Sequence, residues 1–252
     1  MIKALLLDID GTVRKHDTAI PGAIDFVNRL HLPYVFLSNT PDRIGATVAQ
    51  ELRNIGFHCR DDQVVTCLEA TVSSLKPATV FYIGSAVVGQ LLSQAGFEIT
   101  EENPKYVIVA YDTDCTDRKI EKASRLIRNG SMFVGTNPDK VCFTARGVSP
   151  GTGALLAAVQ AATGKQPLII GKPNRSIVDV ALSQLKVPRA EVLLIGDYLE
   201  IDVQAGLNAG VKTGLVLTGA SSKEDLRESP IRPDWIFEDF SEINALLSNQ
   251  EI

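Results

Sequence analysis

The sequence predicts an α/β fold in which parallel strands form a sheet and helices cover both of its faces. Short apolar runs alternate along the whole chain with segments whose apolar residues recur at helical spacing. The chain has 252 residues, of which 45% are hydrophobic and 22% are charged, so it can bury one large core or two smaller ones. It contains neither a fixed-period repeat nor a low-complexity stretch, which disfavours solenoid and disordered proteins.

The expected strands are apolar runs that are short and are followed by polar or turn-forming residues. In chain order they cover residues 4–7, 34–37, 79–83, 106–110, 132–134, 168–170, 192–195 and 214–217. Trp235 is expected to pack in a further, late strand. The segments between the strands are long enough for helices, and such crossover connections favour parallel pairing.

The expected helices include residues 21–30 and 44–55, where apolar side chains recur every three or four positions. Pro21 suits the first turn of the earlier helix, because a residue there needs no N–H donor. Another helix is expected at residues 154–162, after the sequence Gly151-Thr152-Gly153. We interpret this sequence as a tight turn rather than a dinucleotide-binding loop, because the glycine pattern of such loops is incomplete.

Charge and composition exclude several classes of partner. The formal net charge of −5 gives no electrostatic reason to expect nucleic acid or an anionic membrane. The first apolar run is too short for a signal peptide or a membrane span. The four cysteines form no CxxC pair, which disfavours a zinc site and a disulfide framework; they are Cys59, Cys67, Cys115 and Cys142. We therefore expect a soluble, cytoplasmic protein.

Two aspartates follow the first expected strand. Asp8 and Asp10 alternate along an extended chain, so their side chains are expected on the same side. Two close carboxylates repel unless a proton or a cation lies between them, and a hard divalent cation such as Mg²⁺ suits oxygen ligands. Gly11 allows a sharp turn that exposes amide groups, and Thr12 adds a hydroxyl. The alternative is an ordinary polar turn after a strand.

Polar residues also follow the strand at residues 34–37. Ser38, Asn39 and Thr40 come next, and a helix is expected to open at Pro41. Hydroxyl and amide groups in this place can donate hydrogen bonds to a phosphate at the helix N-terminus. Simple capping of the helix is the alternative explanation.

Two later strands end in charged residues. Lys172 follows one of them and would direct a compact positive charge at the ligand-binding edge of the sheet. Asp197 follows the other and is positioned to join Asp8 and Asp10 as a metal ligand. Asp202 is expected to anchor Lys172 or a metal-bound water. A solvated surface charge is the alternative for Lys172, and helix capping is the alternative for Asp202.

All of these groups are expected at one site, because the carboxyl ends of parallel strands meet at one edge of a sheet. Together they provide a candidate nucleophile, a candidate acid and base, donors for phosphate, a lysine and carboxylates for a metal. This set is typical of phosphoryl transfer.

The segments DIDGT, LSNT, GKP and GDYLEID resemble, in order, the four sequence motifs of the haloacid dehalogenase-like (HAD) phosphohydrolase superfamily. The segments GTNPD, PGTGAL and LVLTGASSKEDL, at residues 135–139, 150–155 and 215–226, resemble the NagD-like branch of that superfamily. The resemblance covers essentially the whole chain. The second motif departs from the pattern, because it reads SNTPDR where relatives often have a second Asn or a Ser-Thr pair, and this leaves the roles of Thr40 and Asp42 open.

The resemblance implies a Rossmann-like HAD core with a parallel sheet and a smaller inserted α/β cap domain of the C2 type. We expect the core to comprise residues 1–76 and 167–252 and the cap to comprise residues 77–166. The boundaries are placed at Lys76-Pro77 and Gln166-Pro167, which are the most turn-like junctions in the region.

The resemblance further implies a Mg²⁺-dependent phosphatase that hydrolyses a small-molecule phosphomonoester through an aspartyl phosphate. In this interpretation Asp8 is the nucleophile and Asp10 is the general acid and base. Mg²⁺ is bound by Asp8, the backbone carbonyl of Asp10 and Asp197. The expected phosphate ligands are Gly11, Thr12, Ser38, Asn39, Thr40 and Lys172. Loops at residues 112–117 and 137–149 are candidates for contact with the leaving group.

Two other functions are possible from the sequence. One is a phospho-acceptor or metabolite-binding module without turnover, which would not need an acid and base at Asp10. The other is phosphotransfer to an alcohol by a mutase, but mutases of this superfamily usually insert the cap between the first two motifs. Here only residues 11–37 separate those motifs. The natural substrate, and whether the protein is a monomer or a homodimer, stay open.

Overall fold

The computed structural model describes residues 1–144 and 147–249 of the chain. The chain forms two compact units, and it passes between them four times. The first unit contains residues 1–38, 45–65 and 172–252, and the second contains residues 39–44 and 66–171.

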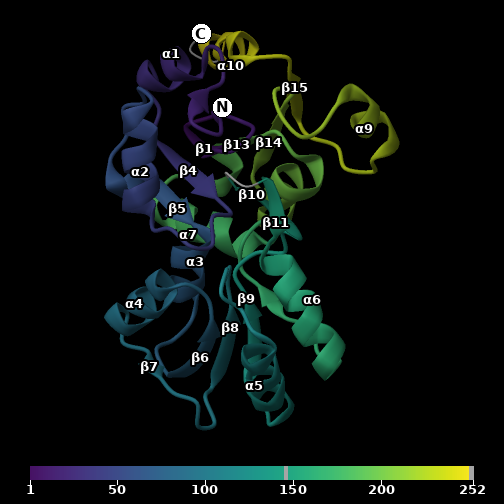
Figure 1. Ribbon diagram of the computed structural model, residues 1–252. Helices are drawn as coiled ribbons and strands as arrows, with labels where there is room; N and C mark the ends of the chain where they lie inside the picture. Colours follow the sequence, from purple (N-terminus) through teal and green to yellow (C-terminus); the bar gives the residue numbers. More distant parts are fainter. Residues whose placement is uncertain (145–146, 250–252) are drawn as a thin grey trace. The chain divides into compact units, whose positions relative to one another are not determined.

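The first unit is built on a six-stranded sheet in which β1 (Ala4–Asp8) lies between β13 (Val192–Gly196) and β4 (Tyr34–Ser38), as Figure 1 shows. Both of these neighbours are parallel to β1, and Leu7 pairs with Ile195 on one side and with Phe36 on the other. Every residue of β1 and β13 is buried, as expected for strands in the middle of a parallel sheet. The remaining strands are β14 (Lys212–Val216), β15 (Trp235–Phe237) and β5 (Val64–Thr66).

Helices cover this sheet. Leu5 and Leu7 share one cluster of buried side chains with Phe26 of α1 (Ala23–Asn28), Leu52 of α2 (Gly45–Asn54) and Phe240 of α10 (Phe240–Ser248). Against other parts of the sheet, α7 (Arg175–Leu185) contacts β4 and α8 (Gln204–Ala209) contacts β14. The smaller elements of this unit are the hairpin β2 (Arg14–Lys15) and β3 (Thr18–Ala19), the turns η1 (Asp61–Gln63) and η2 (Arg189–Glu191), the π-helical turn η3 (Leu199–Val203) and α9 (Lys223–Glu228).

The second unit has its own parallel sheet, in the order β12-β9-β8-β6-β7. Its core joins Ile83 and Val109 of the sheet to Ala123, Leu126 and Leu156 of two helices. Its elements are β6 (Thr79–Ile83), β7 (Glu98–Ile99), β8 (Tyr106–Val109), β9 (Met132–Gly135), β12 (Leu168–Ile169), the hairpin β10 (Val141–Thr144) and β11 (Gly147–Pro150), α3 (Cys67–Ser74), α4 (Ala86–Gln94), α5 (Asp117–Arg128) and α6 (Thr152–Thr163).

The predicted α/β architecture with parallel sheets is confirmed, but one strand belongs elsewhere than expected. Within the expected strand at residues 168–170, Leu168–Ile169 form β12, which pairs with β9 in the sheet of the second unit. Lys172 therefore does not follow a strand of the first sheet. The apolar pattern of a strand does not indicate its partner, because pairing depends on contacts far apart in the sequence.

Two helices begin later than predicted. Pro21 lies before α1, because Gly22 has a left-handed φ of 81° and α1 begins only at Ala23. The helix expected from Pro41 begins at Gly45. Residues 39–44 belong to the second unit, where the carbonyl of Thr40 accepts a hydrogen bond from Cys67 Sγ at 3.2 Å.

The divisions between the units also differ from the expected residues 76/77 and 166/167. The chain passes between units at 65/66 and 171/172 and makes a brief excursion at residues 39–44. In the structure, residue 77 lies between α3 and β6, which both belong to the second unit. A proline indicates a turn between two elements, and such a turn need not separate two domains.

Candidate active site

Asp8 is the last residue of β1, and its carboxylate is held at both oxygens. The hydroxyl of Thr12 lies 2.8 Å from Oδ2 of Asp8 and 3.1 Å from Oδ1 of Asp197. Nζ of Lys172 donates to Oδ1 of Asp8 at 2.5 Å. Asp8, Thr12 and Lys172 are all buried, so these contacts fix the orientation of the Asp8 carboxylate in a site with little water.

Lys172 is bound between two carboxylates. Its ammonium group also donates to Oδ1 of Asp202 at 2.7 Å, and only 2% of its side chain is exposed. Asp202 lies in η3, and its second oxygen accepts a hydrogen bond from the backbone N–H of Tyr198 at 3.1 Å. Lys172 is therefore a buried, paired charge rather than the solvated surface charge that the sequence also allowed.

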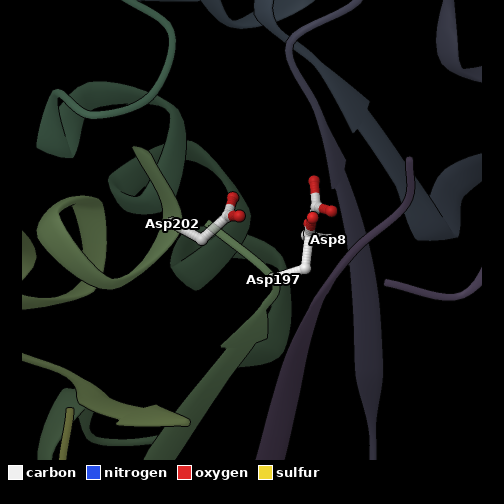
Figure 2. Close-up of side chains that lie close together, drawn as sticks. All are labelled: Asp8, Asp197 and Asp202. Atoms are coloured by element: carbon white, nitrogen blue, oxygen red, sulfur yellow. The ribbon is translucent and has the colours of Figure 1, made fainter. Parts of the chain in front are cut away.

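Asp197 follows the adjacent strand β13. Its Oδ2 accepts a hydrogen bond from the backbone N–H of Ala220 at 2.6 Å. Asp8, Asp197 and Asp202 each offer an oxygen within 4.8 Å of the other two. Figure 2 shows Asp8 and Asp197 side by side, with the carboxylate of Asp202 directed toward them. Three buried acids thus meet at the carboxyl edge of the first sheet.

Two glycines make room for Asp197. Gly11 has a φ of 101°, a conformation that side-chain-bearing residues rarely adopt, and a Cβ there would overlap the Asp197 carboxylate. A Cβ on Gly219 would overlap the same carboxylate from the loop after β14. The backbone can therefore approach Asp197 from both sides only because these positions lack a side chain.

The electrostatics of the site show an excess of negative charge. Burial, and next the charge of Asp202, raise the pKa of Asp8 despite the opposing effect of Lys172. Burial, followed by the charges of Asp8 and Asp202, raises the pKa of Asp197 to about 8. Burial alone would lower the pKa of Lys172, but Asp202 and Asp8 together raise it above its ordinary value. Lys172 therefore stays protonated, whereas Asp8 and Asp197 lose their protons less readily than carboxylic acids in water.

This donor set fits a divalent cation with oxygen ligands. Three ionised carboxylates around one ammonium group would leave two uncompensated negative charges in a buried site. A hard dication would balance them, and the ligands are the carboxylate oxygens that Mg²⁺ prefers. The acidic cluster contains the side chains of Asp8 and Asp197, and the side chain of Asp202 lies with them; Asp10 was expected to contribute its backbone carbonyl.

The side chain of Asp10 lies outside this cluster. It is 54% exposed, and its Oδ1 forms an ion pair with Nε of Arg14 at 2.9 Å. The prediction that Asp8 and Asp10 lie on the same side assumed an extended chain, whereas β1 ends at Asp8 and the chain turns at Gly11. Alternation holds only while the backbone stays extended.

The residues of the second motif are divided between the two units. Ser38 ends β4, next to β1 in the first sheet, and is buried. Asn39 and Thr40 lie in the second unit. There Asn39 Nδ2 lies 3.3 Å from Oδ2 of Asp139, and the Asn39 carbonyl accepts a bond from Asn137 Nδ2 at 2.7 Å.

Thr40 and Asp42, whose roles the sequence left open, have local partners. The hydroxyl of Thr40 accepts a hydrogen bond from Arg43 at 3.3 Å, and Asp42 lies 3.7 Å from the Arg43 guanidinium. In the loop proposed to contact the leaving group, the buried Asp112 forms an ion pair with the partly exposed Lys119 at 2.8 Å. The other proposed loop, residues 137–149, includes residues 145–146, which lie outside the described residues.

The sequence singled out residues 215–226 only as a resemblance to the NagD-like branch and gave the loop after β14 no role in the site. Beyond the bond from Ala220, the hydroxyl of Ser221 accepts the N–H of Leu199 at 3.0 Å, and the hydroxyl of Thr218 donates to the carbonyl of Gly11 at 3.0 Å. The loop therefore supports Asp197, η3 and the turn after β1. The available signal was its position after a strand of the same sheet, next to β13.

Comparison with known proteins agrees with this geometry. The family model described as haloacid dehalogenase-like hydrolase matches residues 5–98, and the model described as HAD-hydrolase-like matches residues 169–243. The acid sugar phosphatase of Staphylococcus epidermidis is 36% identical over 95% of both chains. The ribonucleotide monophosphatase NagD of Escherichia coli is 34% identical over 97% of this chain and 99% of its own.

Solved structures show the same similarity in three dimensions. The 4-nitrophenylphosphatase of Thermotoga maritima superposes with a TM-score of 0.90 at 34% identity, covering 96% of each chain. NagD of Escherichia coli K-12 superposes with a TM-score of 0.90 and covers 96% of this chain and 98% of its own. With matching family models and relatives above 30% identity along nearly the full length, the chain belongs to the haloacid dehalogenase-like hydrolase family, in its NagD-like branch.

Proposed function

We propose that the protein is a Mg²⁺-dependent phosphatase that hydrolyses a small-molecule phosphomonoester through an aspartyl phosphate on Asp8. The observation that carries the proposal is the buried Asp8 carboxylate at the end of β1, held by Lys172 and Thr12 beside two further acids. Its membership in a hydrolase family, and relatives named as phosphatases, support the same reaction.

The acidic cluster is the proposed metal site. Asp8, Asp197 and the backbone carbonyl of Asp10 would hold Mg²⁺, and Asp202 would support the site while it anchors Lys172. When bound, Mg²⁺ would neutralise charge on the non-bridging oxygens of the phosphate.

In the first step, one oxygen of Asp8 attacks phosphorus and the bond from phosphorus to the ester oxygen breaks. Asp10 donates its proton to the departing oxygen, so that an alcohol leaves and Asp8 carries the phosphoryl group. In the second step, Asp10 accepts a proton from a water molecule that attacks phosphorus. The bond from phosphorus to Asp8 breaks, which releases inorganic phosphate and restores the carboxylate.

Other residues bind the phosphate and stabilise its charge. Lys172 is fixed by Asp202 and keeps its proton, so it can stabilise negative charge that develops on phosphorus oxygens. The backbone at Gly11 and Thr12 and the side chain of Ser38 are proposed to donate hydrogen bonds to the phosphate. Asn39 and Thr40 are proposed as further donors.

The proposed substrates are sugar phosphates, nucleoside monophosphates or similar small esters. The relatives carry the names acid sugar phosphatase, ribonucleotide monophosphatase and 4-nitrophenylphosphatase. The second unit is proposed to act as the cap that selects the leaving group. Among the described residues, no helix is both long and apolar enough to cross a membrane. A cytoplasmic location, and a monomer or homodimer, remain the expectation.

Phosphate release from a panel of esters tests the proposal. We expect turnover with Mg²⁺, loss of turnover after exhaustive EDTA treatment, and recovery when Mg²⁺ is restored. Full activity in metal-free buffer would contradict the metal assignment. If the protein becomes phosphorylated but releases no phosphate in repeated turnovers, it is the phospho-acceptor that the sequence left as an alternative.

A further inference from the structure

Arg14 is a buried charge for which the reaction described above has no role. It lies in β2, directly after the loop that carries Asp10 and Gly11, and only 6% of its side chain is exposed. Its Nε lies 2.9 Å from Oδ1 of Asp10, and its Nη1 lies 3.0 Å from Oε2 of Glu51. The guanidinium thus connects Asp10 to helix α2.

The backbone fixes this arrangement. The N–H of Arg14 donates to the carbonyl of Ile9 at 3.1 Å, and the N–H of Gly11 donates to the carbonyl of Arg14 at 2.8 Å. These bonds close the loop that contains Asp10, so Arg14 and Asp10 are held side by side. A planar guanidinium with donors in fixed directions then restricts the orientation of the carboxylate as well as attracting it.

Stability alone does not account for Arg14. Its two partners are partly solvated, with 54% of the Asp10 side chain and 32% of the Glu51 side chain exposed, and ion pairs with such groups contribute little to folding. Burying a guanidinium is unfavourable, and apolar residues often replace buried ion pairs without loss of stability. Burial would lower the pKa of Arg14, but Asp10 and Glu51 raise it, so the side chain stays charged.

We propose that Arg14, held by Glu51, is a positioning residue that orients the Asp10 carboxylate for proton transfer. Nε of Arg14 binds Oδ1 and so fixes the direction of Oδ2, the oxygen that would carry the transferred proton. Glu51, on α2, binds Nη1 of Arg14 and so restricts rotation of the guanidinium away from Asp10. The inference rests on the proposed role of Asp10 as general acid and base.

The test compares two esters whose leaving groups differ in their need for a proton. Arg14→Met keeps an unbranched apolar side chain in place of the aliphatic part of the arginine and removes both ion pairs. We expect kcat/KM for glycerol phosphate to fall about 10- to 100-fold, because a misplaced acid no longer protonates the alkoxide. The pre-steady-state burst with p-nitrophenyl phosphate should slow by less than about threefold, because its phenolate leaves without a proton. Arg14→Lys, which retains the charge but not the fork, should recover only part of the loss.

Two further variants serve as controls. Arg53→Met removes an arginine that is paired with Asp61 at 2.9 Å in the same unit, and it should change neither ester. Glu51→Gln keeps the pair between Arg14 and Asp10 but weakens the anchor, so it should reproduce the selective loss for glycerol phosphate in milder form. Because Asp10 and Glu51 remain partly solvated, removal of Arg14 should leave a folded protein, which circular dichroism would verify.

A double-variant cycle decides whether Arg14 acts through Asp10. The cycle is measured as the slow steady-state turnover of p-nitrophenyl phosphate, which Asp10→Asn retains. In that background Arg14→Met should cause no further loss, because the group that Arg14 positions is already absent. Additive losses, or equal slowing of both esters by Arg14→Met alone, would show that Arg14 is only structural. No loss for either ester would also overturn the inference.

Failure of this inference is distinguishable from failure of the proposed function. Suppose that the wild-type protein forms a phosphoenzyme and that Asp10→Asn blocks phosphorylation by glycerol phosphate but not by p-nitrophenyl phosphate. The proposed function then stands, whatever the effect of Arg14→Met. If Asp10→Asn slows phosphorylation by both esters equally, the role assigned to Asp10 is wrong, and the inference about Arg14 is wrong as well.

Discussion

Lys172 forms two ion pairs, because its ammonium group contacts both Asp8 and Asp202, and its side chain is buried away from bulk water. A protonated amine at this position stabilises negative charge that develops next to Asp8. During phosphoryl transfer that charge is on the phosphate oxygens. The same contacts keep the Asp8 carboxylate in one orientation, so loss of the lysine affects both binding and positioning.

We predict that Lys172→Ala lowers kcat/KM by about two to three orders of magnitude, the range for removal of one charge-stabilising donor. Lys172→Arg should recover little, because a planar fork does not replace a compact ammonium between two carboxylates. Steady-state kinetics with p-nitrophenyl phosphate would measure both effects. A rate near that of the wild type would show that the buried lysine has no part in the reaction.

Substitutions of the two aspartates of the first motif should have different effects on turnover. Asp8→Asn removes the nucleophile and should eliminate turnover of every phosphate ester. Asp10→Asn should abolish phosphorylation by glycerol phosphate but allow it with p-nitrophenyl phosphate, whose leaving group needs no proton. The phosphoenzyme should then accumulate, because no base activates the attacking water. A near-stoichiometric burst of nitrophenol, followed by slow turnover, is the expected signature.

Acid quenching and hydroxylamine treatment provide the control for that burst. An aspartyl phosphate should survive acid and release its phosphate with hydroxylamine. Equal slowing of both esters by Asp10→Asn, without trapped phosphoenzyme, would show that Asp10 does not transfer the proton.

At the scale of single elements, the turn after β1 and the loop after β14 are as necessary to the site as the acids. The sequence was sufficient to find Asp8, Asp197 and Lys172, because a charged residue that closely follows an apolar run can be recognised without a structure. The backbone bond from Ala220 to Asp197 could not be found in that way, because an amide donor has no sequence signature. Nor could the sheet of β12, since its pairing with β9 depends on contacts between distant segments.

Gly11→Ala tests the turn after β1. The new methyl group would overlap the Asp197 carboxylate, so we expect Mg²⁺ affinity and kcat/KM to fall at least tenfold. The matched control is Gly130→Ala. Gly130 has a similar φ of 109°, but a Cβ added there would have no neighbouring atom within 4 Å. Both variants should lose about 1–2 kcal/mol of stability through the strained φ. Only Gly11→Ala should lose activity, and equal activities of the two variants would contradict the packing argument.

The molecule as a whole consists of two units whose arrangement along the chain could be predicted only in outline. The long interval between the second and third motifs predicts an inserted segment, and residues 66–171 form most of the second unit. The excursion of residues 39–44 could not be predicted, because its side chains look like ordinary loop residues. Its assignment depends on tertiary bonds such as that from Cys67 to Thr40.

Stability of the whole molecule should depend on pH in an unusual direction when metal is absent. Asp197 has a pKa of about 8 in the folded protein and an ordinary value of 3.8, so the folded state retains a proton that the unfolded state loses. In EDTA, the free energy of unfolding should therefore decrease as pH rises from about 4 to 8. Thermal unfolding at several pH values would measure this, with Asp197→Asn as the control that weakens the dependence.

Mg²⁺ should reverse that trend. A ligand carboxylate must be deprotonated, so binding should release a proton and affinity should rise with pH up to about 8. Titration calorimetry in two buffers with different ionisation enthalpies would count the protons released. If Mg²⁺ raises the melting temperature no more at pH 8 than at pH 6, Asp197 is not the titrating ligand.

The position of β1 in the sheet has a consequence for protein synthesis. Asp8 is made long before its contact Lys172, which follows 164 positions later, and Thr12 contacts an aspartate 185 positions later. On the ribosome, β1 must therefore wait for β13, while residues 66–171 of the second unit are already complete. A nascent chain therefore contains the nucleophile throughout the synthesis of residues 9–196, and it acquires the acidic cluster only after Asp197 and Asp202 have been made.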